Sequence, residues 1–196
     1  MVTLHLVRHA TYHLVGHALG GRGSGLPLNE AGRSEAARVA AGLAARDLAA
    51  VVSSPQLRAR ETAEPIAAPR GIVVEVDDGF DEIDFGDWTG RDFASLAPSP
   101  EWRAFNTLRS FSQVPGGEAA VAVQARAVAA AMRLASRHSD REAVVVSHCD
   151  VIRSLLAYAL GMPLDLSRRL EVAPGSRSVL VLFDEDVRVD AVNLPA

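Results

Sequence analysis

The chain has 196 residues, of which 48% are hydrophobic and 22% charged, and its net charge is -4. These values suit one globular domain with a sizeable core, and the negative charge argues against a nucleic-acid surface. The apolar stretches are too short, or too interrupted by charge, to span a membrane. The single cysteine, Cys149, cannot form an internal disulfide, so a cytoplasmic location is the simplest expectation.

In the first part of the chain, apolar runs alternate with helical patterns. Strands are predicted at residues 2–7, 49–53 and 72–76, and a glycine-rich loop at 16–25. Asn29 is typical of an N-cap and begins a helix that runs to about residue 46. Pro55 suits the first position of a second helix, which runs to about residue 67, because its missing N–H costs nothing there.

The pattern changes between residues 77 and 117, which hold both tryptophans and most of the phenylalanines. We expect short helices there, forming a mobile, cap-like insertion. A helix to about residue 137, a strand at 143–147, a helix at 151–160 and a closing strand pair at 178–183 and 187–192 follow. This alternation predicts one α/β domain over residues 1–196, with a doubly wound, mainly parallel sheet and helices on both faces.

Three predicted strands end in side chains that bind phosphate or transfer protons. Arg8 and His9 follow the first strand, Arg58 lies shortly after the second, and His148 follows the strand at 143–147. Because chemistry collects where parallel strands end, we expect these four side chains to meet at one edge of the sheet. Two guanidinium groups and two imidazoles would form an anion pocket with a nucleophile, which indicates an enzyme that acts on phosphate.

Each of these residues fits one step of phosphoryl transfer. His9 can act as the nucleophile through a covalent intermediate, and Arg8 and Arg58 can hold the phosphate oxygens through their planar donor groups. His148 can add a third donor if it is protonated. Because the arginines supply positive charge, and the sequence lacks common metal-binding and phosphate-loop motifs, no metal or cofactor is expected.

The leaving alkoxide also needs a proton donor. Glu82 is the first candidate, because its apolar neighbours can raise the pKa of its carboxyl group, but Asp81 and Asp84 compete with it on spacing alone. Four further histidines lack comparable support: His5, His13, His17 and His138.

Five segments, in order along about three-quarters of the chain, make this sequence similar to branch 1 of the histidine phosphatase superfamily, the phosphoglycerate-mutase-like proteins. The segments begin with Leu6-Val7-Arg8-His9, Ser53-Ser54-Pro55-Gln56-Leu57-Arg58, Glu82-Ile83-Asp84-Phe85-Gly86, Pro115-Gly116-Gly117-Glu118 and Val146-Ser147-His148. The resemblance implies about six strands, His9 as nucleophile, and Arg8, Arg58 and His148 as the phosphate pocket. It also implies Glu82, rather than Asp81 or Asp84, as proton donor.

The sequence departs from this family pattern in three places. Ala10 stands where glycine is usual, which matters only if the backbone there needs a positive φ. Cys149 and Asp150 stand where two glycines are usual. The loop at 11–25 is altered and short by about two residues, but Arg22 within it is expected to face the phosphate and bind substrate.

The leading hypothesis is a metal-independent phosphomonoesterase that forms phosphohistidine on His9 and acts on a small-molecule phosphate ester. One alternative is a phosphoglycerate mutase, disfavoured by a short, aromatic cap, although Arg91, Arg103 or Arg109 could bind a carboxylate. A second alternative is a phospholigand-binding protein that has lost catalysis, which the complete set of site residues disfavours. The substrate stays open, and a homodimer is compatible with the sequence.

Overall fold

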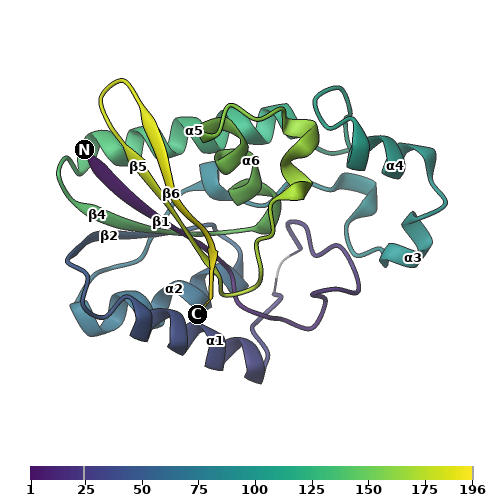
Figure 1. Ribbon diagram of the computed structural model, residues 1–196. Helices are drawn as coiled ribbons and strands as arrows, with labels where there is room; N and C mark the ends of the chain where they lie inside the picture. The colour runs from purple at the N-terminus through teal and green to yellow at the C-terminus, as the bar shows by residue number, and fades with distance from the viewer. Residues whose placement is uncertain (24, 196) are drawn as a thin grey trace.

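The computed structural model describes residues 1–23 and 25–195. A six-stranded sheet forms its centre, in the order β3-β2-β4-β1-β5-β6 (Figure 1). The strands are β1 (Val2–Arg8), β2 (Leu48–Ser53), β3 (Glu75–Val76), β4 (Glu142–Ser147), β5 (Arg177–Leu182) and β6 (Val187–Leu194). The first four run parallel, and β5 and β6 form an antiparallel hairpin beside β1. The predicted fold class is confirmed.

The third strand is shorter than the sequence predicts. Only Glu75 and Val76 pair with β2, opposite Val52 and Ser53. This strand lies at the edge of the sheet, where Val73 is 83% exposed. No strand of the described residues lies beyond it, and only Ile72 and Val74 of the apolar run pack against the neighbouring helices, without joining the ladder.

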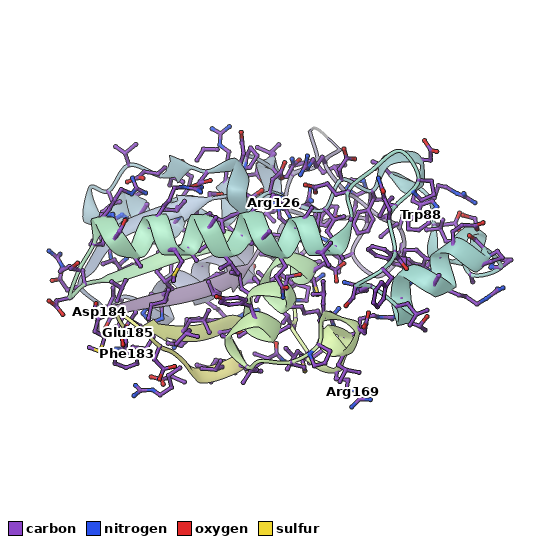
Figure 2. The ribbon with its side chains drawn as sticks, turned by 90° about the horizontal axis from the view of Figure 1, so that it is seen from above. Trp88, Arg126, Arg169, Phe183, Asp184 and Glu185 are labelled. Carbon is purple, nitrogen blue, oxygen red and sulfur yellow. The ribbon has the colours of Figure 1, made fainter. Side chains whose placement is uncertain are left out.

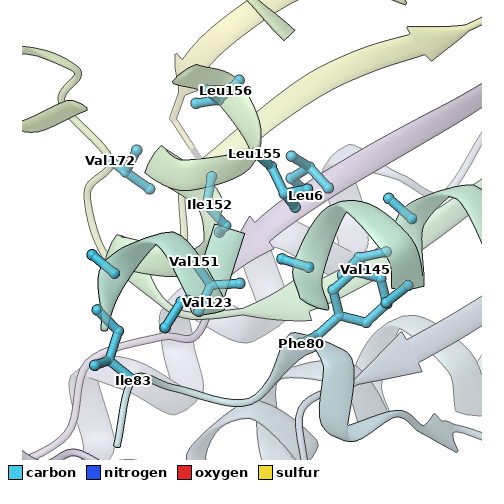
Figure 3. Close-up of a cluster of buried hydrophobic side chains, with 14 of the residues drawn as sticks. Leu6, Phe80, Ile83, Val123, Val145, Val151, Ile152, Leu155, Leu156 and Val172 are labelled. Atoms are coloured by element: carbon cyan, nitrogen blue, oxygen red, sulfur yellow. The ribbon is translucent and has the colours of Figure 1, made fainter. Parts of the chain in front are cut away.

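Successive side chains of a strand point to opposite faces, so the continuous apolar strands make both faces of the sheet apolar. Helices cover both of these faces. Val144 and Val146 pack with α1 (Glu30–Gly42) and α2 (Leu57–Ala67). Val145 packs on the other side with α5 (Ala120–Arg137) and α6 (Cys149–Ala159). Figure 3 shows this second cluster, in which Leu6, Phe80 and Ile152 fill the space between β1, α5 and α6.

Two helix starts test the capping signals of the sequence. The Asn29 side chain accepts a hydrogen bond from the Gly32 backbone N–H, so the predicted N-cap is confirmed. The second helix begins two residues later than predicted, with Gln56 as its N-cap, and Pro55 lies outside it. The first helix ends at Gly42 rather than near residue 46.

No helix among the described residues is long and apolar enough to cross a bilayer.

Residues 77–117, which we call the cap segment, contain the short helices η2 (Asp78–Phe80), η3 (Gly86–Trp88), α3 (Phe93–Leu96) and α4 (Pro100–Thr107). The segment begins against the sheet, where Phe80 joins the core, and its later part, with α3 and α4, projects to one side as a lobe (Figures 1 and 2). Trp88 is buried, with ring centroids 5.4 Å from Trp102 and 5.6 Å from Phe105. These aromatic residues therefore pack on one another and extend the hydrophobic core of this face of the sheet into the lobe.

Candidate active site

The ends of β1, β2 and β4 are aligned at one edge of the sheet. Arg8 lies opposite Ser147, and Ser53 lies opposite Val146. The residues that follow these strands are therefore placed side by side, and the ring centroids of His9 and His148 are 5.1 Å apart. The alanine at position 10 is not among the described residues with a positive φ, so glycine is not required there.

A hydrogen bond to the next residue, Ala10, orients the imidazole of His9. Its Nδ1 lies 2.8 Å from the Ala10 carbonyl oxygen. Because a carbonyl oxygen can only accept, Nδ1 carries the proton and Nε2 keeps its lone pair. Burial, together with the charges of Arg58 and Arg8, holds the pKa of His9 well below its usual value. The imidazole is therefore neutral at physiological pH, the form that can attack phosphorus.

Arg8 and Arg58 supply cationic donors that the protein does not satisfy. Arg8 donates from Nη1 to the Val172 carbonyl at 2.7 Å, and Arg58 from Nη2 to the Gly21 carbonyl at 2.7 Å. Arg8 Nε and Arg58 Nε and Nη1 are buried and have no hydrogen-bond partner among the described protein atoms. Buried donors are normally paired, so these groups favour an anion at this position.

His148 is fully buried and connects the phosphate pocket to β2. Its Nε2 lies 2.7 Å from Ser54 Oγ, and its Nδ1 lies 3.2 Å from Arg58 Nη2 and 3.6 Å from a Glu82 carboxylate oxygen. Burial and the nearby Arg58 charge hold the pKa of His148 well below its usual value. The side chain is neutral without a ligand, so it would donate as a cation only where a bound anion offsets this shift.

Glu82 differs from its two sequence neighbours in its environment. Burial, and secondly the charge of Asp150, raises its pKa to about 7. Asp81 instead accepts hydrogen bonds from Ser54 Oγ, Gln56 Nε2 and the Glu82 backbone N–H, while Asp84 accepts one from the Gly86 backbone N–H. Both aspartates are thus used in loop structure, and of the three candidates only Glu82 is among the described residues that line the cavity.

Arg22 does not take the position that the sequence predicts for it. Its guanidinium contacts Glu118 at 2.8 Å, Asp81 at 3.2 Å and the Glu82 carbonyl oxygen at 2.9 Å. Like Arg58 and His148, it is not among the described residues that line the cavity. The reason for its position is electrostatic, because the carboxylates of Asp81, next to Glu82, and of Glu118, just before α5, attract it. In this arrangement Arg22 supports the loop that carries Glu82.

A cavity of about 620 Å³ opens beside these residues. Its aromatic lining comes from Tyr12, Phe85, Phe93 and Trp102, whereas Trp88 and Phe105 are buried behind them. Its charged lining comes from Arg8, Glu82, Arg109, Asp150, Arg153 and Arg168. A volume of this size can enclose a small organic ligand as well as a phosphate group.

Several of these residues were not identified from the sequence. Tyr12 packs edge-on to His9, with ring centroids 5.3 Å apart, and Arg58 lies over its ring. Asp150 accepts from Arg109 at 2.7 Å, which lowers the pKa of Asp150 although burial opposes this. The sequence analysis noted Asp150 as a departure from the family glycines and Arg109 as a possible carboxylate binder, but it did not pair them, and Tyr12 carries no local signal.

Cys149 lines the cavity too, but its chemistry is unlike that of a nucleophile. Burial, and secondly the charge of Asp150, raises the pKa of its thiol to about 11. Its sulfur donates weakly to the Val172 carbonyl oxygen at 3.6 Å. A thiol with so high a pKa forms almost no thiolate at neutral pH, so His9 is the better nucleophile of the two.

Among solved structures, the Bacillus stearothermophilus protein YhfR aligns with a TM-score of 0.93 and 28% identity, over 100% of this chain and 98% of that one. A mycobacterial glucosyl-3-phosphoglycerate phosphatase in complex with VO3 aligns with a TM-score of 0.88 and 30% identity, over 98% of both chains. An uncharacterized protein of Mycobacterium tuberculosis, Rv0525, is 36% identical over 199 residues, covering 96% of this chain and 94% of its own.

The glucosyl-3-phosphoglycerate phosphatase of Mycobacterium tuberculosis is 33% identical over 149 residues, which cover 69% of this chain and 65% of its own. The family model of the histidine phosphatase superfamily, branch 1, matches residues 4–195. The match spans the sheet from Leu4 of β1 onward and every residue of the site described above. The chain therefore belongs to branch 1 of the histidine phosphatase superfamily.

Proposed function

We propose that this protein is a phosphomonoesterase that works through a phosphohistidine on His9 and needs no metal ion. Its family and the phosphatases among its relatives support a phosphoric monoester hydrolase in general. The observation that carries the proposal is the set of buried guanidinium N–H groups of Arg8 and Arg58 beside a neutral imidazole with a free Nε2. A tetrahedral phosphate would satisfy those donors and present its phosphorus to His9.

In the first step, the lone pair of His9 Nε2 forms a bond to phosphorus and the ester P–O bond breaks. The arginines neutralise the equatorial oxygens, and Glu82 gives its proton to the leaving alkoxide. A pKa of about 7 keeps a large fraction of Glu82 protonated near neutral pH. In the second step, Glu82 takes a proton from water, the water oxygen bonds to phosphorus and the P–N bond breaks. The products are inorganic phosphate and restored His9.

The aromatic cavity lining favours hydrolysis of aryl or large esters over phosphoglycerate interconversion. Phe85, Phe93 and Trp102 offer apolar area worth roughly 25 cal/mol per Å² that a ligand buries. Arg91 and Arg103, two of the sequence candidates for binding a carboxylate, donate to backbone carbonyls of their own segment. Arg109 is paired with Asp150.

The proposal also includes a cytoplasmic location and a single domain over residues 1–196, with a cap-like insertion at residues 77–117.

The decisive experiment compares two activities of the purified protein. Phosphate release is measured from an aryl phosphate and from 3-phosphoglycerate, and phosphoglycerate interconversion is measured with and without a bisphosphoglycerate primer. We expect net phosphate release, fastest from aryl or large esters, and no primer requirement. Interconversion that depends on primer and outruns every hydrolysis would show a mutase instead. Tight ligand binding without turnover of any ester would show a binding protein.

A further inference from the structure

The cavity beside His9 has cationic residues in its lining besides Arg8 of the phosphate pocket. Arg153 on α6 and Arg168 in η4 (Leu164–Arg169) line it, together with the paired residues Arg109 and Asp150. Trp102 and Asn106 of α4 and Phe93 of α3 line the same cavity. The wall facing the leaving-group space thus combines aromatic rings with guanidinium groups.

The charges of this region do not cancel. Asp150 contacts Arg109 at 2.7 Å and Arg153 at 3.8 Å, so one carboxylate serves two guanidinium groups. Arg153 also donates from Nε to the Leu170 carbonyl oxygen at 2.8 Å, which holds its side chain in place. Arg168 is exposed and has no carboxylate within 4.0 Å among the described residues. An excess of positive charge therefore faces the cavity.

A cation near the end of a helix is often only a solubilising residue or a partner for the helix dipole. Arg168 and Arg169 both occupy the last turn of η4, so that explanation applies equally to both. Only Arg168 lines the cavity, whereas Arg169 projects from the surface in Figure 2. The placement of Arg168, together with the anchored Arg153, distinguishes this pair from ordinary surface arginines.

We propose that Arg153 and Arg168 form a second anion subsite, which binds a carboxylate or a second phosphate on the leaving group of the substrate. The inference rests on the proposed phosphatase function and narrows its substrates to esters with an aromatic or apolar body and a second anionic group. The phosphate would occupy the Arg8 and Arg58 pocket, and the body would pack against Phe93 and Trp102. A contact of this kind at a partly exposed site is worth roughly a factor of five to ten in affinity.

The subsite is tested by binding, which does not depend on turnover. Calorimetry compares 4-carboxyphenylphosphonate with 4-carbamoylphenylphosphonate, its neutral counterpart of the same shape. We expect the carboxylate to bind about five- to tenfold more tightly, with a preference that weakens as salt is added. R168Q should reduce the preference to about one, and R169Q is the matched control that should retain it. Equal binding of the two ligands, or an equal preference in R168Q and R169Q, would overturn the subsite.

Hydrolysis of the corresponding phosphate esters separates this inference from the function on which it rests. Hydrolysis of both esters with equal kcat/KM, and equal binding of both phosphonates, would leave the phosphatase standing and refute the subsite. Preferred binding of the carboxylate without hydrolysis of either ester would support the subsite and refute the proposed function. A carboxylate preference in kcat/KM that R168Q removes and R169Q retains would support both.

Discussion

Arg109 and Asp150 join the cap segment to the start of α6 through a 2.7 Å contact in the cavity wall. Arg109 is only 3% exposed, and its guanidinium also lies over the Phe105 ring. The next residue along the chain, Ser110, is held by Asp165 through both its backbone N–H and its hydroxyl group. Two carboxylates thus fasten the last part of the cap segment, and one of them, Asp150, lies close enough to Glu82 to raise its pKa.

The first prediction concerns the pH dependence of D150N. The negative charge of Asp150 raises the pKa of Glu82, second only to burial, so its removal lowers that pKa. Since the acid must be protonated, the falling limb of kcat/KM, expected near pH 7 for an ester with a poor leaving group, should move to lower pH. D165N is the control, because it loosens the same loop without removing that charge. An unmoved limb in D150N would contradict this role.

H9A should abolish turnover and leave the fold intact. The imidazole is buried but neutral, so its loss removes the covalent route without stranding a charge in the core. We expect a melting temperature within about 4 °C of the original, which is roughly 1 kcal/mol for a chain of this size. H17A, at an exposed histidine, serves as control. Trapping with labelled substrate, without acid treatment, should place phosphate on His9; label on Cys149 would refute the mechanism.

E82Q should slow hydrolysis most where the leaving oxygen is basic. Phenyl phosphate needs a proton for its leaving group, whereas 4-nitrophenyl phosphate hardly needs one. We expect a loss of about two to four powers of ten for phenyl phosphate and a much smaller loss for the nitrophenyl ester. The measurement is kcat/KM for both esters in both proteins. Equal losses would indicate that Glu82 has a structural role only.

Activity should survive chelation. The guanidinium groups of Arg8 and Arg58 supply the positive charge that a metal ion supplies in many phosphoryl-transfer enzymes. The rate of aryl phosphate hydrolysis is therefore expected to be unchanged after incubation with EDTA. A loss in EDTA that a divalent ion restores would show that the arginines are insufficient.

R126L should destabilise the protein by loosening the loop at residues 79–82, which carries Glu82. Arg126 donates to the carbonyl oxygens of Gly79, Asp81 and Glu82 and pairs with Glu118 (Figure 2 labels it on α5). We expect a loss of about 3 kcal/mol in the free energy of unfolding, since several charge-assisted bonds are broken. R133L is the matched control two turns further along the same helix. Its exposed pair with Asp77 should contribute less than about 1 kcal/mol. Denaturant unfolding measures both.

The sequence predicted the elements whose signals are local. The strands before His9 and His148, and the Asn29 cap, carry their patterns within a few residues, and the structure places them as expected. Positions set by distant partners were not predictable. Arg22 turns to Glu118 and Asp81, which lie 96 and 59 positions away in the sequence, and Asp150 meets Arg109 across 41 positions. Helix and strand periodicity contains no information about such pairs.

The reversed direction of β5 has a practical consequence for labelling. Its first residue, Arg177, pairs with Val7 beside the site, and its last, Leu182, pairs with Val2 at the far end of β1. The hairpin turn that follows, residues 183–186, is therefore separated from His9 by the length of β1, roughly 20 Å at 3.3 Å per residue. A fluorophore or an inserted epitope at this turn would report on the molecule without obstructing substrate entry, whereas one placed where β6 returns, at Leu194 opposite Arg177, would sit near the catalytic edge.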